Sequence, residues 1–474
     1  MAQVRIEQDL LGAKEVPADA YYGIQTLRAV ENFPITGIPP HKEMIRALAA
    51  VKKAAAMANR DVGVLRAEIA EAIIQATDEI LDGKLHDQFI VDSIQGGAGT
   101  SMNMNVNEVI ANRAIELMGG KKGEYIKCSP NTHVNMAQST NDVFPTAIRI
   151  ASLHLASGVL EALTGLKNAF EMKAKELDSV IKMGRTHLQD AVPIRMGQEF
   201  AAYARVIGRD IERIRRSLDN LREINLGATA VGTGLNALPE YITKVTENLR
   251  QITGLDLKRA EDLVDATQNT DAYTEVSGAL KICAVNLSKI CNDIRLMASG
   301  PRTGFGELKL PPRQPGSSIM PGKVNPVMAE VVNQVAFQIQ GNDLTICLAS
   351  EAGQLELNVM EPVLVFNLLQ SLSILQNAVR VFTTHLVEGL TANVERCKQL
   401  VENSVGVITA INPHVGYETA SMIAKEAIAT GRSVRDICLE KGVLTKEELD
   451  VILNPLEMTT PGIAGARLLF GDRK

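Results

Sequence analysis

Residues 361–377 read EPVLVFNLLQSLSILQN, and this stretch decides the fold expected of the chain. Its apolar side chains recur at helical spacing but occupy more than one face of the helix they predict. A helix that is apolar most of the way round must be buried on most sides. The stretch therefore predicts the core of a bundle of long helices, buried further against other copies of the same chain.

Similar segments lie on both sides along the chain. Apolar residues recur at helical spacing, for example at Leu153, Leu160, Leu163 and Leu166, and this periodicity predicts amphipathic helices. Helices are predicted over about 145–180, 194–224, 272–299, 327–350 and 360–388, with a shorter one near 237–253. The sequence therefore predicts a mainly α protein.

The chain has 474 residues, which is too long for one ordinary domain. Three domains are predicted: residues 1–140, mostly helical; residues 141–395, the bundle of long helices; and residues 396–474, a small helical domain. The first should contain a short hairpin near its start and helices at about 42–60, 64–82 and 102–118, with Ser101 as a helix N-cap. The last carries capping-box patterns at Ser433-x-x-Asp436 and Thr445-x-x-Glu448.

Composition and charge exclude several classes of function. The net charge is −6 and no basic cluster is present, so nucleic acid is not an expected partner. The six cysteines show no paired spacing, which indicates a reducing cytosol and no structural metal. No signal core stands at the N-terminus, and no apolar run approaches the ~18 residues of a membrane span. A cytoplasmic protein without a membrane association is expected.

The loop Gly316–Pro326, GSSIMPGKVNP, carries most of the chemistry. Glycines let backbone amides approach a ligand closely, and Lys323 adds a compact positive charge. The loop suits binding an anion while an adjacent hydroxyl does chemistry. It is not a phosphate-binding P-loop, because Val324 stands where that motif needs Ser or Thr. A flexible linker is the alternative, although linkers seldom mix Ile, Met, Lys and two prolines.

Three more polar loops share this character: residues 95–101 (QGGAGTS), 135–142 (NMAQSTND) and 184–190 (GRTHLQD). Three of the four loops directly precede predicted helices, and helix N-termini favour anions. Each loop also has a simpler explanation. In the simpler explanation, Ser139, Thr140 and Asn141 cap a helix, His187 is a hydrogen-bonded loop residue, and the glycines form turns, without any of them binding a ligand.

Motifs for other chemistries are absent. The sequence has no HExxH, no GxSxG, no GxGxxG after a strand and no Cys/His cluster. Zinc hydrolysis, hydrolytic triads and nicotinamide chemistry therefore lose support, and no cofactor or required metal is expected. Loss of all activity on chelation would contradict this expectation.

GSSIMPGKVNP closely resembles the signature of the aspartase/fumarase superfamily, and the resemblance covers essentially the whole chain. Within the superfamily the sequence is more similar to the aspartate ammonia-lyases than to class II fumarases. The features are Ser139-Thr140-Asn141, the continuation Val327-Met328-Ala329-Glu330, and Tyr22-Gly23-Ile24-Gln25-Thr26-Leu27-Arg28-Ala29. His187 occurs in both groups and does not separate them.

The resemblance implies a three-domain fold and reversible deamination of L-aspartate to fumarate and ammonia. Ser317 would be the general base, acting as an alkoxide on the C3 proton and giving an aci-carboxylate, which Lys323 and Asn325 would stabilise. It also implies a homotetramer in which three subunits contribute to each site. The implied substrate-binding residues are Thr100, Ser139, Thr140, Asn141, Thr186, His187, Ser318, Lys323 and Asn325.

Three alternatives remain open. A class II fumarate hydratase would use the same fold and base, with water leaving instead of ammonia. A helical scaffold built on an enzyme fold would have no need of the reactive loop. A dicarboxylate-binding protein without turnover is the third.

Overall fold

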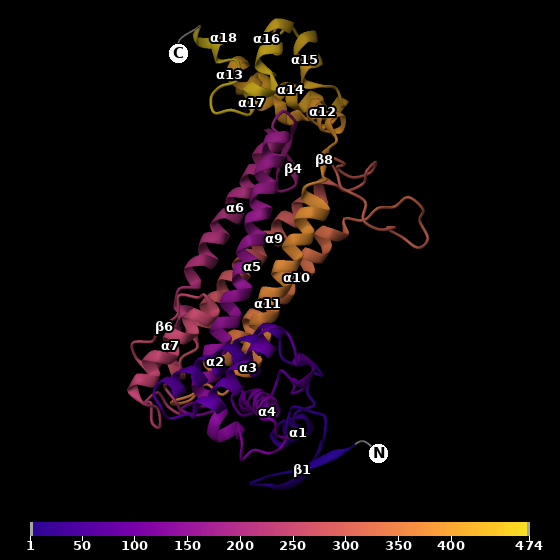
Figure 1. Ribbon diagram of the computed structural model, residues 1–474. Coiled ribbons are helices and arrows are strands. Elements are labelled where there is room, and N and C mark those ends of the chain that lie inside the picture. The colour runs from indigo at the N-terminus through magenta and orange to yellow at the C-terminus, as the bar shows by residue number, and fades with distance from the viewer. Residues whose placement is uncertain (1–2, 472–474) are drawn as a thin grey trace. The chain divides into compact units, whose positions relative to one another are not determined.

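The computed structural model describes residues 3–471 and is mainly helical (Figure 1). The N-terminal region begins with a hairpin of β1 (Val4–Asp9) and β2 (Gly12–Pro17), which are antiparallel. Its helices are α1 (Ile24–Asn32), α2 (Lys42–Asp61), α3 (Ala67–Leu81) and α4 (Thr100–Leu117). The predicted hairpin and the three predicted helices of this region are confirmed.

The predicted cap of α4 is wrong. Gly99, with φ 91°, is the N-cap, and Ser101 lies inside the first turn. The amide of Met102 donates instead to the side-chain oxygen of Gln95 (2.9 Å). A Cβ on Gly99 would lie 2.5 Å from the ring of Phe144, so the close approach of this ring requires glycine and leaves no room for a capping side chain.

The long helices agree with the prediction to within a few residues at most ends. They are α5 (Thr140–Glu176), α6 (Met196–Ser217), α9 (Asp271–Met297), α10 (Val327–Glu351) and α11 (Glu361–Phe382), with the shorter α7 (Pro239–Thr253). Helix α6 ends before the predicted 224 because a 3₁₀ turn, Asn220–Arg222, and strand β5 (Glu223–Ile224) follow. A π-helical turn, Thr383–Val387, continues α11.

Short elements connect the long helices. Strand β5 pairs in parallel with β6 (Lys258–Arg259), and β7 (Leu308–Lys309) pairs with β8 (Thr391–Ala392). Residues 184–190, predicted as a loop, instead form the end of an antiparallel hairpin of β3 (Ile181–Thr186) and β4 (Gln189–Arg195). The remaining helices are α8 (Leu263–Gln268), α12 (Val394–Glu402), α13 (Ile408–Val415), α14 (Tyr417–Thr430), α15 (Val434–Glu440), α16 (Lys446–Ile452), α17 (Pro455–Met458) and α18 (Ala466–Phe470).

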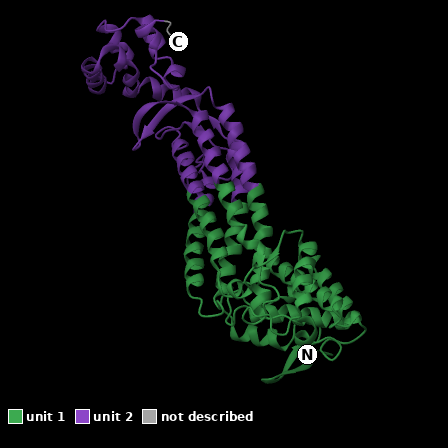
Figure 2. Cartoon of the chain, turned by 90° about the vertical axis from the view of Figure 1, so that its left-hand side faces the viewer, with its two compact units in different colours: residues 1–161, 210–285, 335–377 green, residues 162–209, 286–334, 378–474 purple. Residues whose placement is uncertain are grey.

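The chain falls into two compact units (Figure 2). One unit contains residues 1–161, 210–285 and 335–377, and the other contains residues 162–209, 286–334 and 378–474. The division falls within all five long helices. The boundaries of the three predicted domains stay a prediction.

Each unit has its own core. In the first, the alanine-rich helix α2 packs against α3 and α7 with its small side chains fully buried. In the second, four aromatic rings contact one another, with centroids 5.5–6.3 Å apart: Phe170, Phe200, Tyr203 and Phe382. The C-terminal helices bury a further apolar cluster that includes Met183 of β3. The capping box of α16 is complete, whereas at α15 Ser433 only accepts from the amide of Asp436.

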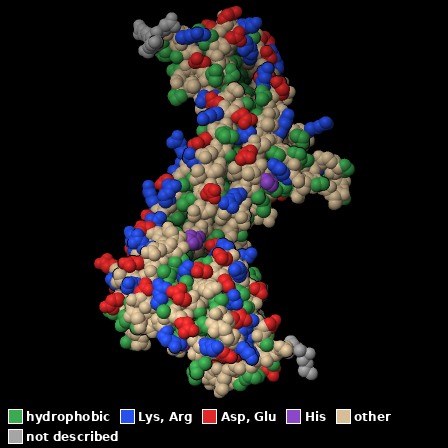
Figure 3. Space-filling model, viewed as in Figure 1, with side chains coloured by type: hydrophobic (Ala, Val, Ile, Leu, Met, Phe, Trp, Pro, Cys, Tyr) green, Lys and Arg blue, Asp and Glu red, His purple; other side chains and the backbone are tan. Residues whose placement is uncertain are grey.

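Two helices, Thr140–Glu176 and Glu361–Val387, are long and apolar enough to cross a membrane by length and composition. Neither helix contains an unbroken apolar run of that length, because polar residues such as Arg149 and Asn367 interrupt them. Of their most apolar windows, 72% and 61% respectively is buried inside the protein, so the core accounts for their apolar character. On the face drawn in Figure 3, acidic and basic side chains are interspersed.

Candidate functional site

The N-termini of α4 and α5 lie side by side in the first unit. Asn103 Nδ2, in the first turn of α4, donates to Thr140 Oγ1 at the start of α5 (3.3 Å). The ring of Phe144 in α5 packs on Gly99, directly before α4. Thr100, Ser139, Thr140 and Asn141 therefore gather at two adjacent helix N-termini, where unpaired amides favour an anion.

The 135–142 loop, residues Asn135–Asp142, is supported by the side chain of a buried lysine. Lys52 of α2 is fully buried, and its Nζ donates to Asn135 Oδ1 and to Gln138 Oε1 (2.9 Å each). Asn107 also donates to Asn135 Oδ1 (3.1 Å). Burial lowers the pKa of Lys52 to about 7, against a smaller opposing effect of Asp142.

A buried anion holds the other end of the same loop. Asp142 accepts from the amides of Ser139 (2.9 Å), Gly227 and Thr229 (3.0 Å each). Burial raises the pKa of Asp142 to about 6, and those amides oppose the rise. Because Ser139 Oγ accepts from the amide of Asn141 (3.2 Å), Ser139 does cap α5, as the simpler explanation required.

Asn141 also has a structural partner. Its Nδ2 donates to the carbonyl of Ala230 (2.8 Å), while its own carbonyl accepts from Asn225 (3.0 Å). The amide side chain is therefore held against the 225–230 segment. Thr100 is exposed, with its hydroxyl donating to the carbonyl of Gly97 (2.7 Å).

Thr186 and His187 lie in the second unit, at the tip of the β3–β4 hairpin. Thr186 pairs with Gln189, which leaves His187 and Leu188 as the two turn residues. Both have left-handed backbone conformations, with φ of 54° and 59°. All three side chains of Thr186, His187 and Leu188 are exposed.

The 316–326 loop, also in the second unit, directly precedes α10 and projects away from the long helices (Figure 1). The hydroxyl oxygen of Ser317 accepts from the amides of Ile319 (3.2 Å) and Met320 (3.1 Å). Two aimed amides stabilise negative charge on that oxygen. Ser318 and Lys323 are exposed.

The base of this loop is closed by backbone contacts. The amide of Gly316 donates to the carbonyl of Lys323 (2.9 Å), and Asn325 Nδ2 donates to the carbonyl of Gly316 (2.6 Å). A Cβ on Gly316 would lie 2.1 Å from the same carbonyl oxygen of Lys323. Asn325 therefore has a structural role in the loop, in addition to the one predicted for it.

The structure thus groups the predicted residues into two sets: those of segments 95–101 and 135–142 in the first unit, and those of segments 184–190 and 316–326 in the second. Loops 95–101, 135–142 and 316–326 directly precede α4, α5 and α10, as predicted. In the described second unit, no hydrogen bond or ion pair joins the hairpin tip to the 316–326 loop. Within residues 3–471, no group of three or more His, Cys, Asp or Glu side chains is arranged to hold a metal.

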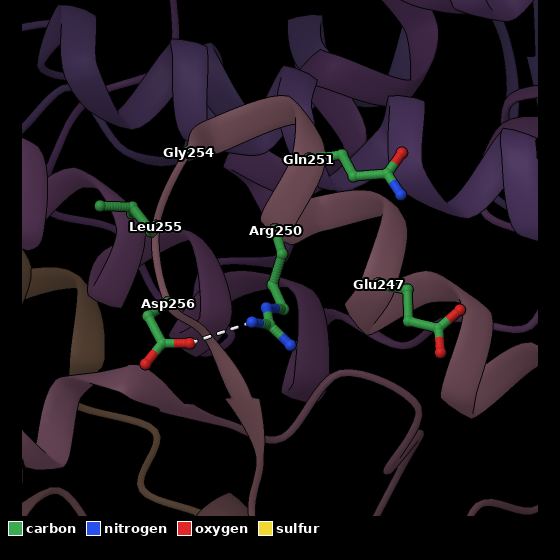
Figure 4. A pocket seen from close by; sticks show the side chains of 6 residues that line it. All are labelled: Glu247, Arg250, Gln251, Gly254, Leu255 and Asp256. Atoms are coloured by element: carbon green, nitrogen blue, oxygen red, sulfur yellow. Dashed lines mark hydrogen bonds and ion pairs between the residues drawn. The ribbon is translucent and has the colours of Figure 1, made fainter.

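One hollow lies away from these residues, at the C-terminal end of α7 (Figure 4). It has a volume of about 460 Å³ and is lined by Glu247, Arg250, Gln251, Gly254, Leu255 and Asp256. Arg250 pairs with Asp256 across it (3.1 Å), and the other charged side chain, Glu247, is directed away from this pair. It contains none of the predicted site residues.

Comparison with known proteins places these loops in a family. A family model described as lyase matches residues 12–341, and one described as fumarase C C-terminus matches residues 407–460. The chain belongs to the aspartase/fumarase family of lyases. The first match contains all the predicted site residues.

Relatives in the aspartase/fumarase family match over nearly their full lengths. An aspartate ammonia-lyase of Bacillus subtilis is 69% identical, with 98% of each chain covered. That of Escherichia coli is 50% identical, again with 98% of each chain covered. Among solved structures, a fumarate lyase:delta crystallin from Brucella melitensis bound to cobalt has a TM-score of 0.94 at 50% identity, covering 97% of this chain and 100% of that chain. A class II fumarase from Schistosoma mansoni has a TM-score of 0.91 at 35% identity, with the same coverage.

Sequence reasoning missed the residues that support the 135–142 loop. Lys52 stands in an alanine-rich helix, where a lysine is normally a solvated residue. Its position four residues after Leu48 and three before Ala55 puts it on the apolar face of the helix, which is a signal in the sequence. Asn103 and Asn107, one helical turn apart in α4, were a second signal, because buried amides require partners.

Proposed function

We propose that this member of the aspartase/fumarase family catalyses the reversible deamination of L-aspartate to fumarate and ammonia. The observation that carries the proposal is the hydroxyl of Ser317, which accepts from two amides of its own loop. The identity of the relatives supports the choice of substrate: aspartate ammonia-lyases are 50–69% identical to this chain, and the class II fumarase is 35% identical.

Ser317 is the proposed general base. The proton on C3 of aspartate is a very weak acid, because its removal places two negative charges on one carboxyl group. A serine hydroxyl ionises only if its oxyanion is stabilised, and the amides of Ile319 and Met320 supply two donors. The cation of Lys323, on the same loop, adds to this stabilisation.

The aci-carboxylate intermediate requires stabilisation of charge as it develops. We assign this role to Lys323 and Asn325. The side chain of Asn325 is held in place by its hydrogen bond to the carbonyl of Gly316. Its proposed role in binding the intermediate therefore requires the loop to keep this bond. Ammonia leaves already protonated, and no general acid is assigned.

The substrate-holding residues have complementary chemistry. Hydroxyls and an imidazole suit carboxylate oxygens, and the N-termini of α4 and α5 add amide donors. Asn141 binds the amino group or a carboxylate. The proposed set is Thr100, Ser139, Thr140, Asn141, Thr186, His187 and Ser318.

We further propose a soluble cytoplasmic homotetramer in which three subunits contribute to each site. Exposed apolar side chains on α10 support assembly: Phe337 (62% exposed), Leu344 (62%) and Leu348 (58%). They are spaced seven and four residues apart, which places them on one face of the helix. An apolar helix face of this kind is typical of an interface.

The test is direct. Purified protein is mixed with L-aspartate, and separately with malate, while the ultraviolet absorbance of fumarate is followed. Formation of fumarate from aspartate, with release of ammonia, supports the proposal. Formation from malate alone would establish the hydratase instead. Binding of either acid without fumarate formation would leave only a binding protein.

A further inference from the structure

The turn at the tip of the β3–β4 hairpin is strained. His187 and Leu188 are the only adjacent pair of non-glycine residues with positive φ in the described chain. A two-residue turn of this geometry usually contains glycine or asparagine. Leu188 is 65% exposed, so burial of its side chain does not offset the strain. Such a conformation persists only where the surroundings impose it.

One strand of the hairpin is tied to a buried carboxylate just below the turn. Arg185 Nη1 donates to Glu307 Oε1 (2.9 Å), and the guanidinium lies 4.1 Å from the centre of the Phe305 ring. Glu307 is fully buried and its backbone is fixed on both sides. Its amide donates to Met297 (2.8 Å), and its carbonyl accepts from Asn393 (2.8 Å).

The charge of this carboxylate is balanced locally. Lys182 Nζ lies 3.5 Å from Glu307 Oε2 and donates to Glu199 Oε1 (3.0 Å). Two cations therefore face two carboxylates inside the second unit. A buried charge cluster of this kind fixes a single arrangement, because any rearrangement would leave a charge unpaired.

The other strand is tied at the directly opposite position. Asp190 is the register partner of Arg185, and its Oδ2 accepts from the hydroxyl of Ser404 (2.8 Å). Ser404 itself is buried and accepts from the amide of Gly406 (3.1 Å). A Cβ on Gly406 would lie 2.1 Å from the carbonyl oxygen of Ala191, so this segment rests directly on the strand.

We infer that the Arg185–Glu307 and Asp190–Ser404 contacts are positioning devices that hold Thr186 and His187 ready for a substrate carboxylate. The inference rests on the proposed function, in which both residues bind substrate. Arg185 and Asp190, which make these contacts, form the register pair next to Thr186 and Gln189. Together the contacts therefore fix both strands next to the strained turn. Preorganisation of this kind lowers the entropy lost when substrate binds.

The test compares variants of the full chain in the L-aspartate assay and in inhibition by succinate, a dicarboxylate that cannot eliminate. Asp190→Ala removes the acceptor of Ser404 at an exposed residue, so folding is not at risk. KM and the inhibition constant of succinate should rise roughly 10-fold, with a smaller change in kcat. Asp190→Asn retains an acceptor oxygen and should restore both constants to within about twofold.

Leu188→Gly tests the same inference without removing a contact. Glycine adopts the left-handed conformation readily, so thermal stability should be unchanged or higher, while KM for L-aspartate rises because the turn is less constrained. Leu355→Gly is the matched control. Leu355 is also exposed, with φ 54°, in the turn between α10 and α11. The control should leave KM unchanged.

Arg185→Lys tests the second tie, because lysine keeps the charge of the cluster but loses the guanidinium that stacks on Phe305. It should raise KM in the same direction as Asp190→Ala. Wild-type KM and succinate inhibition in Asp190→Ala and Leu188→Gly would overturn the inference. If the wild-type protein does not convert L-aspartate, the proposed function fails instead, and succinate affinity still decides the role of the two ties.

Discussion

At the scale of single residues, the structure repeatedly uses backbone amides to hold an oxygen that carries or could carry negative charge. Asp142 accepts hydrogen bonds from three backbone amides, and the hydroxyl of Ser317 accepts them from two. The difference lies in exposure. Asp142 is fully buried and serves the loop that it anchors, whereas Ser317 lies on an exposed loop within reach of a ligand. A serine oxygen that accepts from two amides is easier to ionise than a free hydroxyl.

Ser317→Ala removes the proposed base. Turnover of L-aspartate should fall by roughly 10²–10⁴-fold, the usual contribution of a general base, while the fold and the affinity for succinate change little. Fumarate formation, circular dichroism and succinate binding are measured together. Ser318→Ala is the control: its hydroxyl holds substrate in the proposal, so KM should change more than kcat. Near-normal turnover of Ser317→Ala would exclude this residue as the base.

Lys52 gives a pH dependence with a definite sign. Burial lowers the pKa of its ammonium from 10.5 to about 7, so between these values the unfolded chain binds one proton more than the folded chain. The stability of the wild type relative to Lys52→Met should therefore increase as the pH rises through this window, by at most about 1.4 kcal/mol per pH unit. Urea unfolding at several pH values measures the difference. A difference that does not depend on pH would contradict the lowered pKa.

At the scale of elements, the 316–326 loop is a small closed structure and not a flexible connection. Its base is formed by the Gly316–Lys323 backbone bond and by the side chain of Asn325, and the turn above it aims two amides at Ser317. The contacts that close the loop and the turn that holds Ser317 are only a few residues apart. Disrupting the closing contacts is therefore expected to displace Ser317.

Gly316→Ala tests this dependence. The added methyl would lie 2.1 Å from the carbonyl oxygen of Lys323, so the base of the loop must open. We expect kcat/KM to fall at least roughly 10-fold, with little change in thermal stability because the loop is exposed. Gly322→Ala is the control: nothing lies within 4 Å of its added methyl, although its φ of 83° disfavours alanine. An equal effect of the two variants would show that the close contact at Gly316 is unimportant.

The long helices could be predicted from the sequence, whereas the β3–β4 hairpin could not, because helices depend on local periodicity and this hairpin depends on distant contacts. Periodicity is a local property, and it located α5, α9 and α10 closely. The β3–β4 hairpin escaped because His187-Leu188 is not a typical turn sequence, and its conformation depends on distant partners such as Glu307 and Ser404. Sequence alone singled out the four polar segments, one of which is the end of this hairpin, but not the supporting role of Lys52, whose partners lie over 80 positions away.

At the scale of the whole molecule, the exposed apolar face of α10 supports the proposed association of subunits. Phe337, Leu344 and Leu348 are each more than half exposed, on a helix whose opposite face is buried. Fully burying an exposed side chain of this size contributes about 1.5–3 kcal/mol, and the part of each that is still exposed would contribute a share of this to assembly. If sites are shared between subunits, assembly and activity should be lost together.

Phe337→Glu tests this coupling by placing a charge on the proposed interface. The wild type should sediment as a tetramer at micromolar concentration, and the variant as smaller species with little or no activity and an intact helical spectrum. Sedimentation velocity and the L-aspartate assay measure the two quantities on the same samples. A wild-type monomer, or an active monomeric variant, would contradict the shared site.

The exposure of the 316–326 loop has a practical consequence for handling the protein. Lys323 is exposed and is followed by Val324, so trypsin can cut the chain between Ser317 and Asn325. A single cut there would separate the two residues while leaving every long helix intact. If Ser317 and Asn325 have the proposed roles, preparations nicked during purification would look folded yet be inactive, and protection of this bond by succinate would give a simple gel-based measure of ligand occupancy.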